Sequence, residues 1–164
     1  MDRQEIQSKI KELENELSEL REELNKTGTK VFKPKFGDTY YYICVYGEVR
    51  EEVWTDTEFD KAVYALGNCF ETREEAKFEV EKLKVIAELK RFAMEHNEPM
   101  DWRDENQKKY FICYDCGKNK MMYIDYWNTL KNDNIYFSSA EIAEQAIKTI
   151  GEERIKKYYL GVED

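Results

Sequence analysis

The chain has 164 residues, of which 41% are hydrophobic and 37% are charged. This length allows one ordinary domain, or two small units with an appendage. The net charge of −9 argues against non-specific binding to nucleic acid, because that binding needs clustered Lys and Arg. An acidic surface remains compatible with a basic protein partner, including a nucleic-acid-binding effector.

The sequence has no signal for a membrane or for secretion. No apolar run approaches the roughly 20 residues that a helix needs to cross a bilayer. The N-terminus is charged and does not have the pattern of a signal peptide. We therefore expect a cytoplasmic protein without membrane contact, whose four cysteines are free thiols.

Residues 1–27 are predicted to form a coiled-coil helix that joins copies of the chain. Apolar residues at alternating steps of four and three make up its seam: Ile6, Ile10, Leu13, Leu17, Leu20 and Leu24. In a parallel pair, Lys9 would face Glu14 and Glu16 would face Arg21, both with opposite charges. Residues 5–25 thus predict a homodimer or a higher oligomer. The alternative is a helix that packs on its own domain.

Residues 28–38 are expected to be a linker, because Gly28 can end the helix and Pro34 prevents its continuation. After it, two stretches of the chain resemble each other. Residues 41–45 recur as residues 110–114 at an offset of 69, and residues 68–72 recur as 135–139 at an offset of 67. Trp54 and Trp127 lie between these landmarks. The spacing indicates one module used twice, in residues 39–98 and 99–164.

Each module is predicted to be a hairpin followed by a helix. Residues 39–46 and 49–55 are typical of paired strands, a loop rich in Asp and Glu follows, and Thr72 with Glu75 marks a helix start. In the second module, residues 109–116 and 121–126 form the hairpin and Ser138 with Glu141 the helix start. Gly151 interrupts this helix, and residues 155–160 resume it.

The predicted fold class is therefore α+β, with an N-terminal coiled-coil helix and two tandem ββ(β)α modules that contain antiparallel hairpins. The first strand of each module is apolar or aromatic on both faces, which is typical of a strand covered on both sides. The modules could pack sheet edge to sheet edge, or each could bury one face against a partner subunit. We expect the first arrangement for the core.

Carboxylates between residues 48 and 60 are the sharpest charge feature of the chain. A solvated hairpin face is the ordinary interpretation, and a contact surface for a basic partner is the functional one. The predicted partner-binding residues are Glu48, Glu51, Glu52, Trp54, Asp56, Glu58 and Asp60. No spacing motif supports divalent-metal or acid–base chemistry there.

Cysteine and histidine give weak signals for chemistry. Cys113 and Cys116 can supply half of a zinc site, but no second pair accompanies them. Cys113 also matches Cys44 in the repeat, which indicates a buried apolar position. His96 is the only histidine, and no nucleophile motif accompanies it. We expect no catalytic residue, metal or cofactor, although metal binding by the cysteine pair stays open.

Parts of the chain resemble small accessory proteins of bacteriophages and prophages. The resemblance covers most of the chain after the coiled coil. It rests on residues 33–41, Trp54, residues 67–72 and 74–76, and residues 136–139. Those proteins are largely uncharacterised, so the resemblance implies a mobile-element setting and assigns no residue to an activity.

The expected function is that of a non-enzymatic, oligomeric binding protein. In the phage setting, it would inhibit a host defence effector in the manner of an anti-CRISPR protein, by covering a basic surface in the host cytoplasm. The coiled coil would raise avidity. Two alternatives stay open: a protein that sequesters a signalling nucleotide between aromatic side chains, and a structural or regulatory phage protein.

Overall fold

The computed structural model describes residues 7, 9–17, 32–126, 129 and 131–162. The chain divides into two compact units, residues 1–35 and 36–164. In the first unit, residues 9–17 are helical, within the segment predicted to be a coiled coil. The seam residues Ile6, Leu20 and Leu24 lie outside the described residues.

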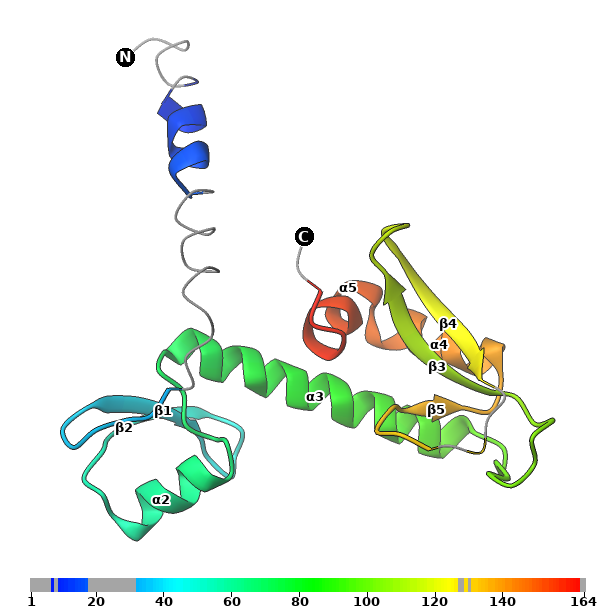
Figure 1. Cartoon of the computed structure of the whole chain (residues 1–164), viewed down its shortest axis with the longest axis horizontal. Helices are drawn as coiled ribbons and strands as arrows, with labels where there is room; N and C mark the ends of the chain where they lie inside the picture. The colour runs from blue at the N-terminus through cyan, green and yellow to red at the C-terminus, as the bar shows by residue number, and fades with distance from the viewer. Residues whose placement is uncertain (1–6, 8, 18–31, 127–128, 130, 163–164) are drawn as a thin grey trace. The chain divides into compact units, whose positions relative to one another are not determined.

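The second unit mixes helices and antiparallel strands, which confirms the α+β class (Figure 1). Its elements are β1 (Thr39–Ile43), β2 (Val49–Val53), α2 (Glu58–Ala65), α3 (Arg73–His96), β3 (Lys109–Asp115), β4 (Lys120–Tyr126), β5 (Tyr136–Phe137), α4 (Ala140–Ile150), α5 (Glu152–Arg154) and the π-helix η1 (Ile155–Tyr159). The strands form two sheets, β1–β2 and β4–β3–β5. The expected edge-to-edge packing of one sheet on the other is therefore wrong.

The β1–β2 hairpin is covered on one face by α2, a helix where the sequence pattern predicts a loop. α2 forms because Thr57 accepts a hydrogen bond from the Asp60 backbone N–H, while the Asp60 side chain accepts one from Thr57 N–H. Tyr40 and Tyr42 both point to this face, since alternate residues of a strand share a face. The Tyr42 ring packs edge-on against Phe59 of α2, with centroids 5.3 Å apart.

A short third segment extends this hairpin. Tyr41 and Phe70 exchange both backbone hydrogen bonds, at 3.0 and 2.9 Å, as an isolated antiparallel bridge. The Asn68 side chain forms the two hydrogen bonds that a neighbouring strand would form with Ile43. Its amide oxygen accepts from Ile43 N–H, and its amide nitrogen donates to Ile43 C=O. The chain then turns into α3 at Thr72.

α3 has 24 residues and contacts β1, β2, α4 and η1. It begins as predicted, with reciprocal hydrogen bonds between Thr72 and Glu75. After it ends at His96, the Asn97 side chain bonds to the backbone before and after Phe137 of β5: its amide nitrogen donates to Tyr136 C=O, and its oxygen accepts from Ser138 N–H. The end of α3 is thereby fixed to the three-stranded sheet.

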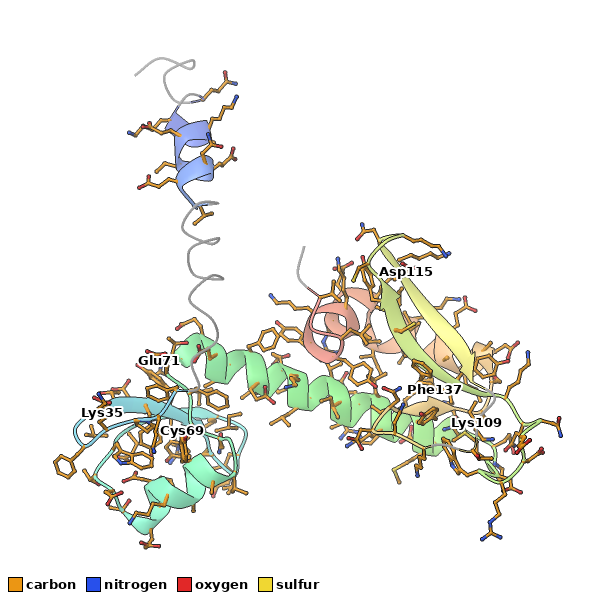
Figure 2. The ribbon with its side chains drawn as sticks, viewed as in Figure 1. Lys35, Cys69, Glu71, Lys109, Asp115 and Phe137 are labelled. Atoms are coloured by element: carbon orange, nitrogen blue, oxygen red, sulfur yellow. The ribbon has the colours of Figure 1, made fainter. Side chains whose placement is uncertain are left out.

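The main core lies between α3, the three-stranded sheet, α4 and η1. It consists of Val85, Leu89, Phe92, Ala93, Ile112, Met121, Ile135, Phe137, Ala143, Ala146, Ile150 and Ile155. Phe137, labelled in Figure 2, is fully buried in it. β5 therefore contributes to the core although it is only two residues long.

The C-terminal helices follow the predicted order with one correction. The side chain that caps the start of α4 is that of Ser139, which accepts a hydrogen bond from Ile142 N–H. Ser138, the predicted cap, instead accepts one from Glu98 N–H. Gly151 ends α4 as predicted, at a φ of +102° that favours glycine. Residues after it continue as α5 and η1.

Candidate functional site

Asp60 does not belong to the predicted acidic contact surface. It is 1% exposed, whereas Glu48, Glu51, Glu52, Asp56 and Glu58 are exposed. Tyr40 Oη donates to Asp60 Oδ1 at 2.8 Å, and the backbone N–H groups of Thr55 and Thr57 donate to Asp60 Oδ2 at 3.0 and 2.9 Å. The carboxylate is thus an internal acceptor that joins β1, the loop after β2 and α2.

Hydrogen bonds determine the charge state of this buried group. Burial alone would raise the pKa of Asp60, but the bonds from Thr57, Tyr40 and Thr55 outweigh it and lower the pKa well below its usual range. The pKa of Tyr40 is raised by burial and by its bond to the Asp60 carboxylate. Asp60 is therefore ionised and Tyr40 protonated at neutral pH.

Most exposed carboxylates of the hairpin face a cation of the same chain. The pairs are Glu48 with Arg50 at 3.6 Å, Glu51 with Arg73 at 3.5 Å, and Lys61 with Asp56 at 3.7 Å and with Glu58 at 3.3 Å. Exposed pairs of this kind are weak, yet they reduce the local charge. Successive strand residues also alternate between faces, so Glu51 and Glu52 point to opposite sides of the hairpin.

The predicted partner-binding Trp54 is half-buried and packs inward. Its indole lies edge-on to the Tyr40 ring at 5.9 Å and to the Tyr64 ring at 6.1 Å. The hairpin therefore does not bring its predicted residues into one acidic and aromatic patch.

Such a patch occurs instead at the start of α3. Phe70 and Phe78 line an open hollow of about 440 Å³ together with Glu74, Glu75 and Glu79. Glu75 is engaged in the helix cap, and Glu79 pairs with Lys82 at 3.0 Å. Among the described residues, nothing bonds to the exposed Glu74 side chain.

The walls of this hollow are fixed by packing. The Phe78 ring lies 5.1 Å from the Tyr158 ring of η1. The Phe70 backbone is fixed by its bridge to Tyr41, and the Arg73 guanidinium lies over the Tyr41 ring at 5.3 Å. Sequence reasoning used Glu75 only as a helix cap and missed the hollow. The available signal was Phe78, an aromatic residue one turn after an acidic helix start.

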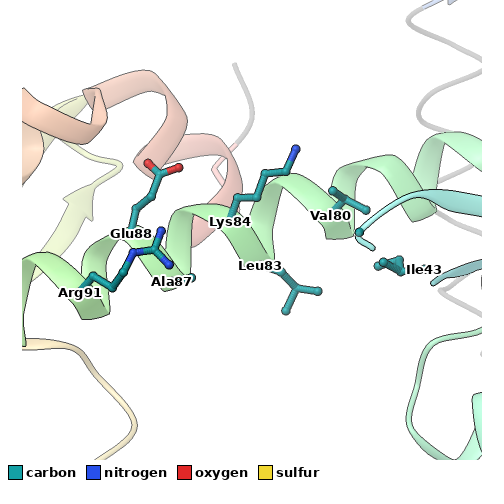
Figure 3. Close-up of a pocket in the computed structure, with 8 residues that line it drawn as sticks. Ile43, Val80, Leu83, Lys84, Ala87, Glu88 and Arg91 are labelled. Atoms are coloured by element: carbon teal, nitrogen blue, oxygen red, sulfur yellow. The ribbon is translucent and has the colours of Figure 1, made fainter. Parts of the chain in front are cut away.

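A second hollow of about 280 Å³ lies along the middle of α3. Figure 3 shows Val80, Leu83 and Ala87 of the helix together with Ile43 from the end of β1. Its rim includes Glu88, whose carboxylate forms two hydrogen bonds with Arg154, at 2.8 and 3.0 Å. This pair lowers the pKa of Glu88 and ties α5 to α3.

The cysteine pair and His96, which the sequence analysis considered for chemistry, lie in different surroundings. Burial raises the pKa of the Cys113 thiol, whereas Cys116 is exposed. Within the described ranges, no group of three or more His, Cys, Asp or Glu side chains could hold a metal ion. His96 stacks on Phe92 with ring centroids 4.0 Å apart, and its Nδ1 lies 2.9 Å from Phe92 C=O. The contacts of His96 are those of a helix end.

The described residues of the predicted coiled-coil seam are exposed in the single chain. Ile10, Leu13 and Leu17 are 50%, 54% and 51% exposed in the single chain. Three apolar side chains at this spacing form a stripe that a partner helix can cover.

Comparison of the chain with protein-family models, with curated proteins and with solved structures gave no match. Of the helices that the structure describes, none combines the length and the apolar character needed to span a membrane.

Proposed function

We propose that this chain is a non-enzymatic binding protein that holds a basic segment of a protein partner in the hollow at the start of α3. The observation that carries the proposal is the pairing of two phenylalanine rings with a carboxylate that no described residue neutralises. Phe70 and Phe78 supply the rings, and Glu74 supplies the carboxylate.

An arginine or lysine side chain fits this arrangement chemically. Its charged end is attracted to aromatic faces and forms a strong, charge-assisted hydrogen bond with a carboxylate. Glu79 offers a second carboxylate if its partly buried bond to Lys82 is given up. The hollow thus accounts for both attraction and orientation of one cationic side chain.

The charge distribution supports a basic partner for the body of the protein. Residues 1–35 contain eight acidic and eight basic side chains, so the whole excess of −9 belongs to residues 36–164. A net negative body accelerates association with a positively charged surface.

Self-association through residues 5–25 is part of the same proposal. The exposed stripe of Ile10, Leu13 and Leu17 supports it, since an isolated helix of this length is marginal in water. Two bodies on one coiled coil would bind two basic segments at once and gain avidity.

The tandem arrangement of residues 39–98 and 99–164 also belongs to the proposal. Tyr41 pairs with Phe70, and Tyr110 pairs with Phe137, so two pairs of residues related by the repeat are strand partners. Each pair precedes a helix with a Thr or Ser at its start. These features support two related ββ(β)α modules, of which the first has acquired α2.

In the phage setting that the sequence resemblance implies, the partner would be a nucleic-acid-binding effector of host defence. Occupation of its basic surface by the acidic body would inhibit it in the host cytoplasm. The alternative, a structural role in the phage, differs from this inhibitor role because it would need the coiled coil but not the hollow.

Titration with a fluorescein-labelled, arginine-rich peptide tests the hollow directly by fluorescence anisotropy. Glu74→Lys should weaken peptide binding about tenfold, the effect of losing roughly 1.4 kcal/mol. Glu95→Lys is the matched control, because Glu95 is an exposed residue near the other end of the same helix. Equal affinities for the two variants would contradict the proposed site.

A further inference from the structure

A separate hollow of about 290 Å³ lies at the other end of α3. It is formed by the end of α3, by the loop that follows this helix, and by residues in and just before β5. The residues that matter here are Lys90, Met94, Met100, Trp102, Lys131 and Tyr136.

Trp102 is held as a rigid wall of this hollow. The Tyr136 ring meets its indole edge-on at 4.8 Å. Lys109 Nζ lies 5.4 Å from the indole centroid, and this ammonium group is fixed by hydrogen bonds to Asp104 C=O and Gln107 C=O, both 3.0 Å long. Because Lys109 is fully buried, its charge stays close to the indole.

Two lysines and one carboxylate, that of Asp133, line this hollow, so its lining is net positive in an acidic protein. Lys131 Nζ also lies 5.4 Å from the Trp102 centroid, and Lys90 lines the same space. Elsewhere on α3, Lys82 and Lys84 pair with Glu79 and Glu81. Neither Lys90 nor Lys131 has such a carboxylate partner within the described parts of the chain.

The apolar lining suits a flat molecule. Met94 is 85% exposed at the rim, and Met100 lies in the lining with it. Thioether side chains adapt to varied shapes and pack well against aromatic rings. The volume is at the lower end of the range for small-molecule sites, about 300 to 1,000 Å³.

We propose that this hollow binds a small aromatic anion, of about the size of a nucleoside monophosphate. The aromatic part stacks on Trp102 between the methionines, as bases stack on aromatic residues in other proteins. Lys90 and Lys131 hold the phosphate or carboxylate by charge-assisted hydrogen bonds. Lys109 does not touch the ligand; it positions the indole.

Isothermal titration calorimetry on the full chain tests the proposal with adenosine monophosphate, indole-3-acetate, adenosine and inorganic phosphate as probes. We expect adenosine monophosphate or indole-3-acetate to bind at least tenfold more tightly than adenosine or phosphate alone. The preferred member of the first pair identifies the anionic group. Failure of both to bind would overturn the proposal.

Two variants locate the site. Lys131→Gln should weaken binding of the preferred probe about tenfold, and Lys84→Gln is the control because it removes an equal charge from an exposed site on α3. Trp102→Leu should abolish binding, with circular dichroism confirming that the variant is folded. Unchanged affinity in Lys131→Gln would overturn the proposed site, and none of these results depends on the hollow at the start of α3.

Discussion

Replacing Asp60 by alanine should strongly destabilise the first hairpin and α2. The change leaves the buried Tyr40 Oη without its acceptor. It also removes the acceptor of three partly buried bonds, those from the N–H groups of Thr55 and Thr57 and from Thr55 Oγ1. A buried donor without a partner costs about 1 to 3 kcal/mol, and some of this cost is recovered as water enters the new space. Because only the Tyr40 donor is fully buried, we expect a loss of roughly 2 to 4 kcal/mol in the free energy of unfolding.

Urea unfolding followed by circular dichroism measures this loss, and hydrogen exchange locates it. Exchange of the Thr55 and Thr57 amides should accelerate most, because those two N–H groups lose the carboxylate. Glu58→Ala is a matched control in the same turn of α2, since its carboxylate makes only an exposed contact with Lys61. The control should lose no more than about 1 kcal/mol. Equal losses in the two variants would refute the assigned role of Asp60.

The same carboxylate predicts a pH dependence. Its pKa is lower in the folded chain than the value of about 3.9 expected in the unfolded chain. The ionised form therefore contributes stability above about pH 4, and this contribution is lost as the pH falls through the folded pKa. The difference in unfolding free energy between wild type and Asp60→Ala should shrink between pH 6 and pH 2. A constant difference over that interval would contradict the assigned charge state.

Three further outcomes are expected. Leu13→Asp should convert the proposed oligomer to monomer in light scattering, because a charge would occupy the predicted seam; an unchanged mass would disprove the proposed coiled coil. With a thiol reagent at pH 8, the exposed Cys116 should react at least ten times faster than Cys69, whose pKa is raised to about 11 by burial and by nearby Asp60. A double-mutant cycle on Glu88 and Arg154 should give a coupling of about 1 kcal/mol, as expected for a two-bond pair that is partly exposed.

Local signals in the sequence were sufficient to predict the start of α3 and the end of α4. Thr72 and Glu75 bond to each other within one helical turn, so their spacing alone identifies the start. Gly151 likewise ends α4 through its own backbone conformation. These features need no information from distant parts of the chain.

α2 was missed because its residues resemble an exposed, charged loop. The helix is short. Its capping box pairs Thr57 with Asp60, at a position where Glu or Gln is usual. Only the fold reveals that Asp60 is buried beneath Tyr40, 20 residues earlier in the chain. Counting carboxylates along the sequence cannot separate an internal acceptor from a surface charge.

The start of α4 illustrates a different limit. Ser138 and Ser139 are adjacent, and either can accept a hydrogen bond from a helix N-terminus. The fold uses Ser138 to accept from Glu98 N–H, 40 residues away, and leaves Ser139 for the helix. A contact between distant segments therefore decides which of two equivalent residues begins α4.

Tyr40 and Lys109 are related by the 69-residue offset, and both are fully buried polar side chains at corresponding ends of β1 and β3. Each donates hydrogen bonds to a segment outside the sheets: Tyr40 to Asp60 of α2, and Lys109 to the loop that carries Trp102. The strands thus keep one position for a buried donor, while the segments that supply the acceptors differ in length and structure. The shared strand positions serve the fold in both halves, so ligand binding is expected in the segments that differ between them. Trp102 lies in such a segment.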